Sequence, residues 1–157
     1  MNVVILGCGR VGAFLAGLLD ADGDPVCIID LEQSAFRRLP AGFRGTTILG
    51  NGTDLDVLRQ AGIEKADAFL SLTQGDNRNL MAAQVAKEIF RVPQVLAKVN
   101  DPIRAHTYRK RGIYTWSRTT ILGTLLHAIL TGREDIGPRL MTEAMRHEDD
   151  LANAMGT

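Results

Sequence analysis

Three glycines near the start of the chain have the spacing of a phosphate-binding turn. Gly7, Gly9 and Gly12 form a G-x-G-x-x-G pattern directly after an apolar run at residues 1–6. In such a turn the first glycine permits a tight bend, the second lets the backbone approach a pyrophosphate, and the third lets a helix pack closely on a strand. The amides at the start of that helix would then face an anion.

An acidic residue stands where a nucleotide ligand requires one. Asp30 follows Gly12 by 18 positions, near the spacing of about 20 expected for a carboxylate that accepts hydrogen bonds from a ribose. Asp30 also precedes a predicted helix from Glu32, so the alternative is a helix cap. Because a carboxylate repels a 2′-phosphate and the next residue is Leu31 rather than an arginine, the pattern favours a free ribose over NADP.

The rest of the chain alternates between strand and helix patterns, which predicts a parallel sheet covered on both faces. We expect a doubly wound, Rossmann-like α/β fold with about six strands in the order 3-2-1-4-5-6 and a crevice at the carboxyl ends of strands 1 and 4. The predicted strands are 1–6, 25–30, 46–49, 67–72, 95–99 and 112–116. The predicted helices are 13–19, 32–38, 54–60, 77–90, one from Pro102, and 119–130, and in the fourth of these Leu80, Ala83, Val85 and Ile89 are expected to face the core.

Three polar loops follow predicted strands and are expected around the same crevice. They span residues 50–54, 73–77 and 100–102. Each by itself is also compatible with ordinary turn and helix-cap chemistry. Together they predict the outline of a ligand cleft.

Length and composition predict one domain at residues 1–131 and a tail at 132–157 that forms at most a short helix and is partly disordered. The 18 basic and 18 acidic side chains balance, which argues against nucleic acid as a partner. The strand pattern begins at Asn2 and no apolar run is long enough to span a bilayer. We therefore expect a soluble, cytoplasmic protein without a signal peptide.

The two cysteines suit a reducing compartment better than a disulfide framework. Cys27 lies in a predicted strand and is expected in the core. Cys8 lies in the glycine turn and has two interpretations. It is either a packed residue or a redox-sensitive thiol whose pKa is lowered by the neighbouring helix N-terminus.

The chain carries no recognisable enzyme signature. It lacks a Walker loop, a nucleophile elbow and a zinc-binding helix, and its three histidines have no metal-ligand spacing. We therefore predict no catalytic and no metal-binding residues. A basic group is interpreted as a solvated helix face, with contact to a membrane partner as the alternative, and it comprises Arg104, Arg109, Lys110 and Arg111.

Several segments carry a more specific signal than the glycine turn alone. They are VILGCGRVG at 4–12, Asp30, GNGTD at 50–54, DNRNLMAA at 76–83 and AKVNDP at 97–102. Taken in order over residues 1–131, they resemble the nucleotide-binding domain of the regulators of potassium conductance. That family includes the cytoplasmic subunits of Trk- and Ktr-type potassium transporters.

The resemblance implies a role for each segment. The phosphates would contact residues 9–11, the ribose would contact Asp30, and the adenine end would contact residues 51–53. Arg10 could also reach the terminal phosphate of a nucleotide bound to its own subunit or to a neighbouring one. Residues 117–120 lack the carboxylate of metal-dependent relatives, which disfavours metal-assisted ATP binding. The full candidate set is Gly7, Cys8, Gly9, Arg10, Val11, Gly12, Asp30, Leu31, Asn51, Gly52, Thr53, Thr73, Asn77 and Lys98.

For function, the resemblance implies a regulatory subunit without chemical turnover, in which adenine nucleotide binding gates a potassium transport system. The ligand would be NAD, NADH, ATP, ADP or AMP. The partner would be a membrane-embedded potassium transporter subunit, which places the chain at the inner face of the membrane. Two alternatives stay open: a fragment of an NAD-dependent dehydrogenase, for which little chain remains after residue 131, and a stand-alone NAD-redox sensor.

The predicted helix at 119–130 is apolar on nearly all sides. Positions 121, 125 and 129 lie about 100° around the helix from positions 122, 126 and 130, so one domain cannot bury both stripes. Related regulators pair through a helix at this place. We therefore expect a dimerisation helix and a homodimer or higher oligomer.

Overall fold

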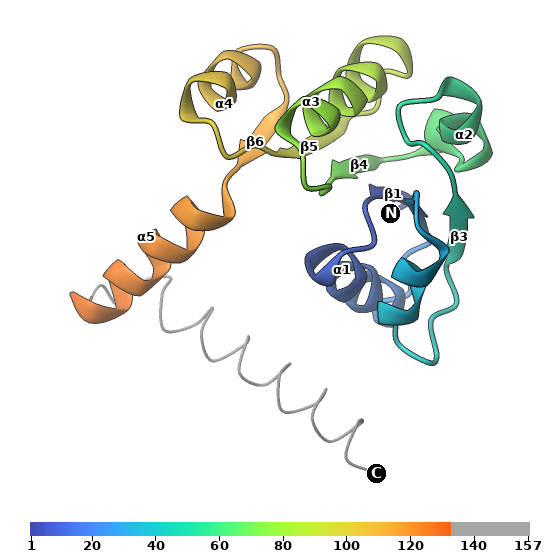
Figure 1. Cartoon of the computed structure of the whole chain (residues 1–157), viewed down its shortest axis with the longest axis horizontal. Helices are drawn as coiled ribbons and strands as arrows, with labels where there is room; N and C mark the ends of the chain where they lie inside the picture. Colours follow the sequence, from blue (N-terminus) through green and yellow to red (C-terminus); the bar gives the residue numbers. More distant parts are fainter. Residues whose placement is uncertain (133–157) are drawn as a thin grey trace. The chain divides into compact units, whose positions relative to one another are not determined.

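A computed structural model describes residues 1–132, and these contain one parallel sheet of six strands (Figure 1). The strand order is β3-β2-β1-β4-β5-β6, as predicted. The order reverses direction between β1 and β4, which is the place where ligands bind in open α/β sheets. The strands are β1 (Val3–Leu6), β2 (Val26–Asp30), β3 (Thr46–Leu49), β4 (Ala68–Ser71), β5 (Gln94–Lys98) and β6 (Tyr114–Trp116).

Helices connect successive strands, and the chain divides into two units after Ser117. The sheet and its covering helices form the first unit, Met1–Ser117, and the last helix belongs to the second. Most of the predicted tail, residues 133–157, lies outside the described part of the chain. The α-helices are α1 (Arg10–Ala21), α2 (Leu55–Gln60), α3 (Asp76–Gln84), α4 (Pro102–Arg109) and α5 (Arg118–Leu130), with shorter turns η1 (Gln33–Arg38), η2 (Ile63–Lys65) and η3 (Val85–Ile89).

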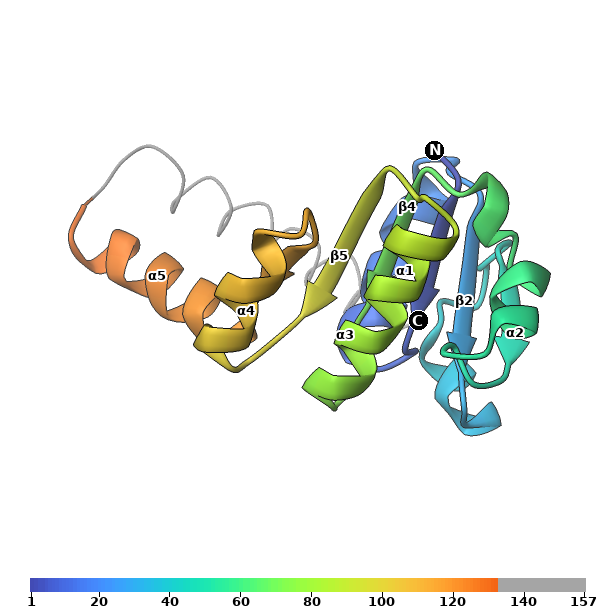
Figure 2. The same ribbon diagram turned by 90° about the horizontal axis from the view of Figure 1, so that it is seen from above.

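Alternate side chains of β1, β2 and β4 enter two separate cores, one on each face of the sheet. Val4 and Leu6 of β1 pack with residues from α2, α3 and α4, whereas Val3 and Ile5 pack with α1 and η1. Figures 1 and 2 show α1 and α3 on opposite faces. Because strands buried on both faces read as continuous apolar runs, this arrangement explains the sequence VVIL of β1.

The ends of the three central strands are level with one another. Leu6 pairs with Ile29 of β2 and with Ser71 of β4. The Gly7 amide then donates to the Ile29 carbonyl at 2.8 Å, and the Leu72 amide donates to the Leu6 carbonyl at 2.8 Å. The loops that leave β1, β2 and β4 therefore begin side by side.

Two predicted helices differ in detail from the observed ones. The segment expected at 32–38 is the 3₁₀-helix η1, and the segment expected at 77–90 begins at Asp76 and ends in the π-helical turn η3. The π turn is wider than an α-helical turn, which changes the direction of the side chains within it: Ala86 is buried, while Ile89, the last residue of the turn, is 55% exposed. The prediction that Ile89 faces the core was wrong. Leu80 and Ala83, which precede the turn, are buried as predicted.

Helix α5 forms where the apolar run predicted it. None of its side chains is buried, and Ile121, Leu122, Leu126 and Leu130 are all exposed. Across residues 1–132, the helices are all too short or too polar to traverse a lipid bilayer.

Candidate functional site

A cavity of about 580 Å³ lies at the carboxyl ends of β1, β2 and β4. That volume is within the range of about 300 to 1,000 Å³ typical of small-molecule sites. Of the 14 predicted site residues, nine line this cavity, and they are Gly7, Cys8, Gly9, Arg10, Asp30, Leu31, Asn51, Gly52 and Thr73. The sheet topology thus brings together loops that lie as far as 66 positions apart in sequence, from Gly7 to Thr73.

Two glycines of the turn are required by the fold itself. Gly7 has φ of 107°, and a Cβ there would lie 3.1 Å from the backbone carbon of Leu72. A Cβ on Gly12 would lie 2.0 Å from the carbonyl oxygen of Gly7. A side chain at Gly12 would therefore separate α1 from the turn, and one at Gly7 would be strained and would press on the chain after β4.

Gly9 differs because the fold does not require a glycine there. Its φ of −76° and ψ of −174° are open to any residue, and a Cβ would meet nothing within 4 Å. Gly9 is the N-cap of α1, no side chain caps this helix, and its first turn holds no acidic residue. The cavity therefore faces an open helix N-terminus, whose amides and dipole attract an anion.

Asp30 connects β2 to the glycine turn. One carboxylate oxygen accepts from the Cys8 amide at 2.6 Å, and the other accepts from the Glu32 amide at 3.0 Å. The second bond shows that Asp30 also holds the entry to η1, as the helix-cap alternative proposed. A carboxylate has about four acceptor positions, so both oxygens retain capacity toward the cavity that Asp30 lines.

Both cysteines are packed rather than reactive. Burial raises the pKa of the Cys8 thiol to about 11, the charge of Asp30 adds to this effect, and Arg38 opposes it. The Cys8 thiol donates to the Ala35 carbonyl at 3.4 Å. Burial also raises the pKa of Cys27 to about 11. The raised pKa contradicts the alternative in which the helix N-terminus lowers the pKa of Cys8.

The loop after β3 adds another side to the cavity. The Asn51 side-chain oxygen accepts from the amide of Thr53 at 3.2 Å and from its hydroxyl at 2.9 Å. Thr53 does not line the cavity but orients Asn51, which does. Gly52 is buried, and a Cβ there would lie 2.3 Å from a methyl group of Leu6.

A buried asparagine holds the loop after β4 in place. The Asn79 oxygen accepts from the Thr73 amide at 2.9 Å and from the Thr73 hydroxyl at 2.7 Å. Its nitrogen donates to the carbonyls of Thr73 at 3.0 Å and Lys98 at 2.8 Å. We call these four hydrogen bonds the Asn79 latch. Lys98 contributes its backbone carbonyl to the latch and does not line the cavity. Asn79 was quoted as part of a motif, but its role as the latch was not predicted.

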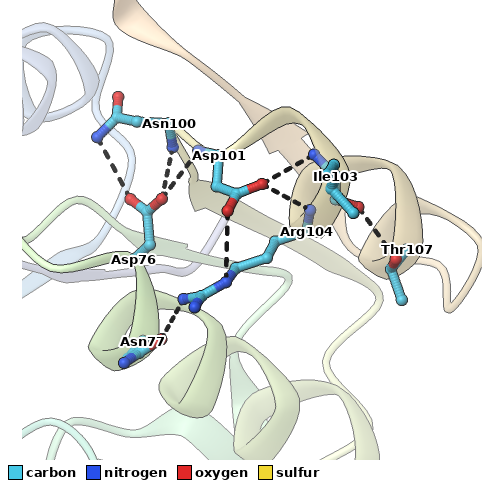
Figure 3. Close-up of polar contacts among 7 residues, drawn as sticks. All are labelled: Asp76, Asn77, Asn100, Asp101, Ile103, Arg104 and Thr107. Carbon is cyan, nitrogen blue, oxygen red and sulfur yellow. Dashed lines mark hydrogen bonds and ion pairs between the residues drawn. The ribbon is translucent and has the colours of Figure 1, made fainter.

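Asn77 does not line the cavity and instead belongs to a polar network between α3 and α4 (Figure 3). Asp76 accepts from the amides of Asn100 at 2.9 Å and Asp101 at 3.0 Å. Arg104 lies 3.6 Å from the Asp101 carboxylate and donates to the Asn77 oxygen. Arg104 is therefore engaged in this network rather than simply solvated.

Five polar wall residues are missing from the predicted candidate set, and two predicted candidates lie off the wall within α1. Val11 is exposed but outside the cavity lining, and Gly12 packs against Gly7. The missed residues lie close in sequence to Asp30 or Thr73, which was the available signal. They are Glu32, Ser34 and Arg38 from the η1 segment, and Gln74 and Arg78 from the start of α3.

Curated relatives of this chain are potassium uptake proteins. A Trk system potassium uptake protein TrkA of Streptomyces coelicolor is 46% identical over 131 residues, covering 80% of this chain and 59% of that protein. A TrkA homolog of Methanothermobacter thermautotrophicus is 37% identical over 113 residues, covering 72% of this chain and 52% of that protein. The chain thus spans between half and two thirds of the length of these relatives.

Solved structures show the same fold. The TrkA-N domain of the Escherichia coli inner membrane protein ybaL has a TM-score of 0.73 at 17% identity, over 82% of this chain and 96% of that one. The GsuK channel bound to NAD has a TM-score of 0.69 at 24% identity, over 85% of this chain and 24% of that one. The AMP-bound Kef CTD of Shewanella denitrificans has a TM-score of 0.68 at 20% identity, over 99% and 97% of the two chains.

The sequence model of the TrkA-N domain matches residues 3–117. This range begins with the first residue of β1 and ends directly after β6, so it includes the whole sheet and every segment that lines the cavity. The chain therefore belongs to the TrkA-N family.

Proposed function

We propose that this chain is a regulatory nucleotide-binding part of a potassium uptake system and that its cavity binds an adenine nucleotide. The observation that carries this proposal is Gly9. The fold tolerates a side chain there, yet the residue is a glycine at an open helix N-terminus that faces the cavity. A glycine without a structural reason at that place is explained by a phosphate that needs the space.

In this proposal the ligand follows the order of the strand ends. The phosphates occupy the N-terminus of α1 near Gly9 and Arg10, and Asp30 accepts hydrogen bonds from a free ribose. The adenine end lies toward Asn51 and Gly52, and the other end of the ligand lies toward Thr73. All of these residues line one cavity.

Related proteins support both the ligand class and the partner. GsuK structures are described with NAD and with ADP, and the Kef CTD is described with AMP. The curated relatives are named as potassium uptake proteins. We infer that NAD, NADH, ATP, ADP or AMP binds here, and that a membrane-embedded potassium transporter subunit at the cytoplasmic face is the partner.

The proposed role is regulation without chemical turnover. Of the side chains that commonly act as general acids or bases, the cavity wall holds only Asp30, Glu32 and Cys8. Asp30 is engaged by two backbone amides and the Cys8 thiol has a raised pKa. These observations favour a regulator over the dehydrogenase alternative. Such a ligand would act by binding one conformation of a transporter complex more tightly than another.

We propose that α5 pairs with a second copy of the chain. Its exposed Ile121, Leu122 and Leu126 support this, because a contiguous apolar surface of this kind marks an interaction site. Sedimentation equilibrium at micromolar concentration is expected to give a dimer. The combined change Leu126→Glu and Ile129→Glu is expected to give a folded monomer, and a dimer that survives both changes contradicts the pairing.

Two N-cap glycines allow a matched test of nucleotide binding. Gly9 caps α1 on the cavity wall, while Gly75 caps α3 outside the lining, and neither would bring a Cβ within 4 Å of another group. Serine is a preferred N-cap, so Gly9→Ser and Gly75→Ser are both expected to fold with unchanged or slightly higher stability. In Gly9→Ser, however, the new side chain occupies the space proposed for the phosphates.

Isothermal titration calorimetry with ADP and with NADH gives the readout. The wild type and Gly75→Ser are expected to bind with similar affinity. The affinity of Gly9→Ser for both ligands is expected to be at least about tenfold weaker, which corresponds to about 1.4 kcal/mol of binding free energy. Wild-type protein that binds neither ligand, or a folded Gly9→Ser that binds as tightly as wild type, contradicts the proposed function.

A further inference from the structure

Two arginines on the cavity wall have no side-chain partner among the residues that the structure describes. Arg10 is the first residue of α1 and Arg78 is the third residue of α3, and both line the cavity. Neither makes an ion pair or a side-chain hydrogen bond within residues 1–132, and both are exposed. The third arginine of the wall, Arg38, differs because it donates to the Ala35 carbonyl at 3.4 Å.

Arg78 lies on the opposite side of the glycine turn from Asp30. The strands run in the order β2, β1, β4, with Asp30 ending β2, the glycine turn after β1, and Arg78 in the helix after β4. Neighbouring strands are about 4.8 Å apart, so the ends of β2 and β4 are separated by about 10 Å. A ligand with its ribose at Asp30 and its first phosphate at the glycine turn would therefore extend its next group toward Arg78.

The backbone around Arg78 is held on both sides. Asp76 is fixed by the amides of Asn100 and Asp101, as Figure 3 shows, and Asn79 is buried in its latch with Thr73. Asn77 accepts from Arg104 on the side away from the cavity. An arginine with a fixed backbone and an unpaired guanidinium is suited to bind an anion, because a guanidinium can donate two parallel hydrogen bonds to a phosphate.

We propose that Arg78 is a specificity-determining residue that binds the second phosphate of the nucleotide. The cavity therefore selects adenosine diphosphate or triphosphate over AMP, which has only one phosphate. This inference rests on the proposed nucleotide-binding function. The terminal phosphate of ADP carries more negative charge than a phosphodiester and presents three oxygens to the guanidinium. The ligand class is thus a nucleoside diphosphate or triphosphate whose second phosphate reaches α3.

The test compares ADP with AMP on the full chain by calorimetry. Wild-type protein is expected to bind ADP at least about tenfold more tightly than AMP, since each charge-assisted hydrogen bond contributes on this scale. Arg78→Gln is expected to lose about tenfold for ADP and to change the AMP affinity by less than about twofold. The ADP affinity of Arg78→Lys is expected to lie between those of the wild type and Arg78→Gln, because lysine keeps the charge but cannot donate two parallel hydrogen bonds.

Arg109→Gln is the matched control, since Arg109 is an exposed arginine at the end of α4 and outside the cavity lining. It removes the same charge and is expected to leave both affinities unchanged. Equal losses for ADP and AMP in Arg78→Gln, or equal wild-type affinity for the two nucleotides, overturn the inference while the proposed function stands. Wild-type protein that binds no nucleotide overturns both.

Discussion

The two walls of the cavity hold their polar groups in different ways. On the β1–β2 side, the fold itself engages the acidic group and the turn: Asp30 accepts from two backbone amides, and close backbone contacts keep the turn tight at Gly7 and Gly12. Arg10 is the exception on this side, since within residues 1–132 its side chain makes no ion pair or hydrogen bond. On the β4 side, the Asn79 latch fixes the backbone, while Arg78 keeps an unpaired side chain. The first wall is therefore formed before any ligand arrives, and the second can respond to what the ligand carries.

This difference fits a regulator. A ribose and a first phosphate are shared by all the adenine nucleotides proposed as ligands, so a fixed wall suits them. In the proposed binding mode, the part that differs between AMP, ADP and NAD lies toward the wall that holds Arg78. A ligand shifts a conformational equilibrium only if it binds one conformation more tightly than another. We propose that nucleotides differ in this respect through the contacts they make on the β4 side.

The largest expected effect tests the latch on the β4 side. Asn79→Ala removes four hydrogen bonds, three with Thr73 and one with the Lys98 carbonyl, and leaves the Thr73 amide without this acceptor. Buried groups left unpaired cost about 1 to 3 kcal/mol each, so we expect a loss of about 3 to 5 kcal/mol in the free energy of unfolding. Urea denaturation measures this value.

The control for the latch is Asn77→Ala. Asn77 is an exposed neighbour on the same turn of α3, and its change is expected to cost about 0.5 kcal/mol or less. If Asn79→Ala costs no more than Asn77→Ala, the wall on the β4 side is not held by a buried amide, and the comparison of the two walls fails.

A smaller effect is expected within the glycine turn. Gly12→Ala places a methyl group 2.0 Å from the Gly7 oxygen, which forces a backbone shift. We expect a loss of about 2 to 3 kcal/mol in the free energy of unfolding. Gly9→Ala meets open space and is expected to lose only about 0.5 to 1 kcal/mol, through poorer capping of α1. Similar losses for the two variants in thermal or urea unfolding would show that the three glycines share one structural role.

A change in stability smaller than that of Asn79→Ala or Gly12→Ala is expected at Asp30. Asp30→Asn keeps one acceptor oxygen and loses the bond to either Cys8 or Glu32, with an expected cost of about 1 kcal/mol. Binding is the more informative readout. Wild-type protein is expected to bind NADH at least about tenfold more tightly than NADPH, and Asp30→Asn is expected to narrow that ratio, because the repelling charge is gone. Equal wild-type affinity for NADH and NADPH would remove the role assigned to Asp30.

The sequence predicted the parts of the site that backbone rules govern. Gly7 and Gly12 follow from turn geometry and close packing, and the strand order follows from the alternation of strands and helices. The position of Asp30 follows from its place at the end of a predicted strand. These features depend on local residue types and on a topology with few alternatives.

The sequence pattern did not predict the direction of the side chains at the starts of helices. Asn77 and Arg78 are neighbours in one polar loop, but consecutive residues of a helix point about 100° apart. Because α3 begins at Asp76, Asn77 faces the α4 network and Arg78 faces the cavity. In the same way, Arg38 reaches the wall from a 3₁₀-helix, and the π turn η3 turns Ile89 outward. Each outcome depends on the exact start or winding of a helix.

The most direct test of the central claim is an amide chemical-shift titration of ¹⁵N-labelled protein with ADP. The claim is that the nucleotide binds at the carboxyl ends of β1, β2 and β4. The account predicts saturable shifts at Gly9, Arg10 and Thr73, which line the cavity. It predicts unchanged resonances at Gly23 and Gly62, which precede β2 and β4 at the opposite edge of the sheet. Shifts confined to that opposite edge, or no shifts at millimolar ADP, would contradict the account.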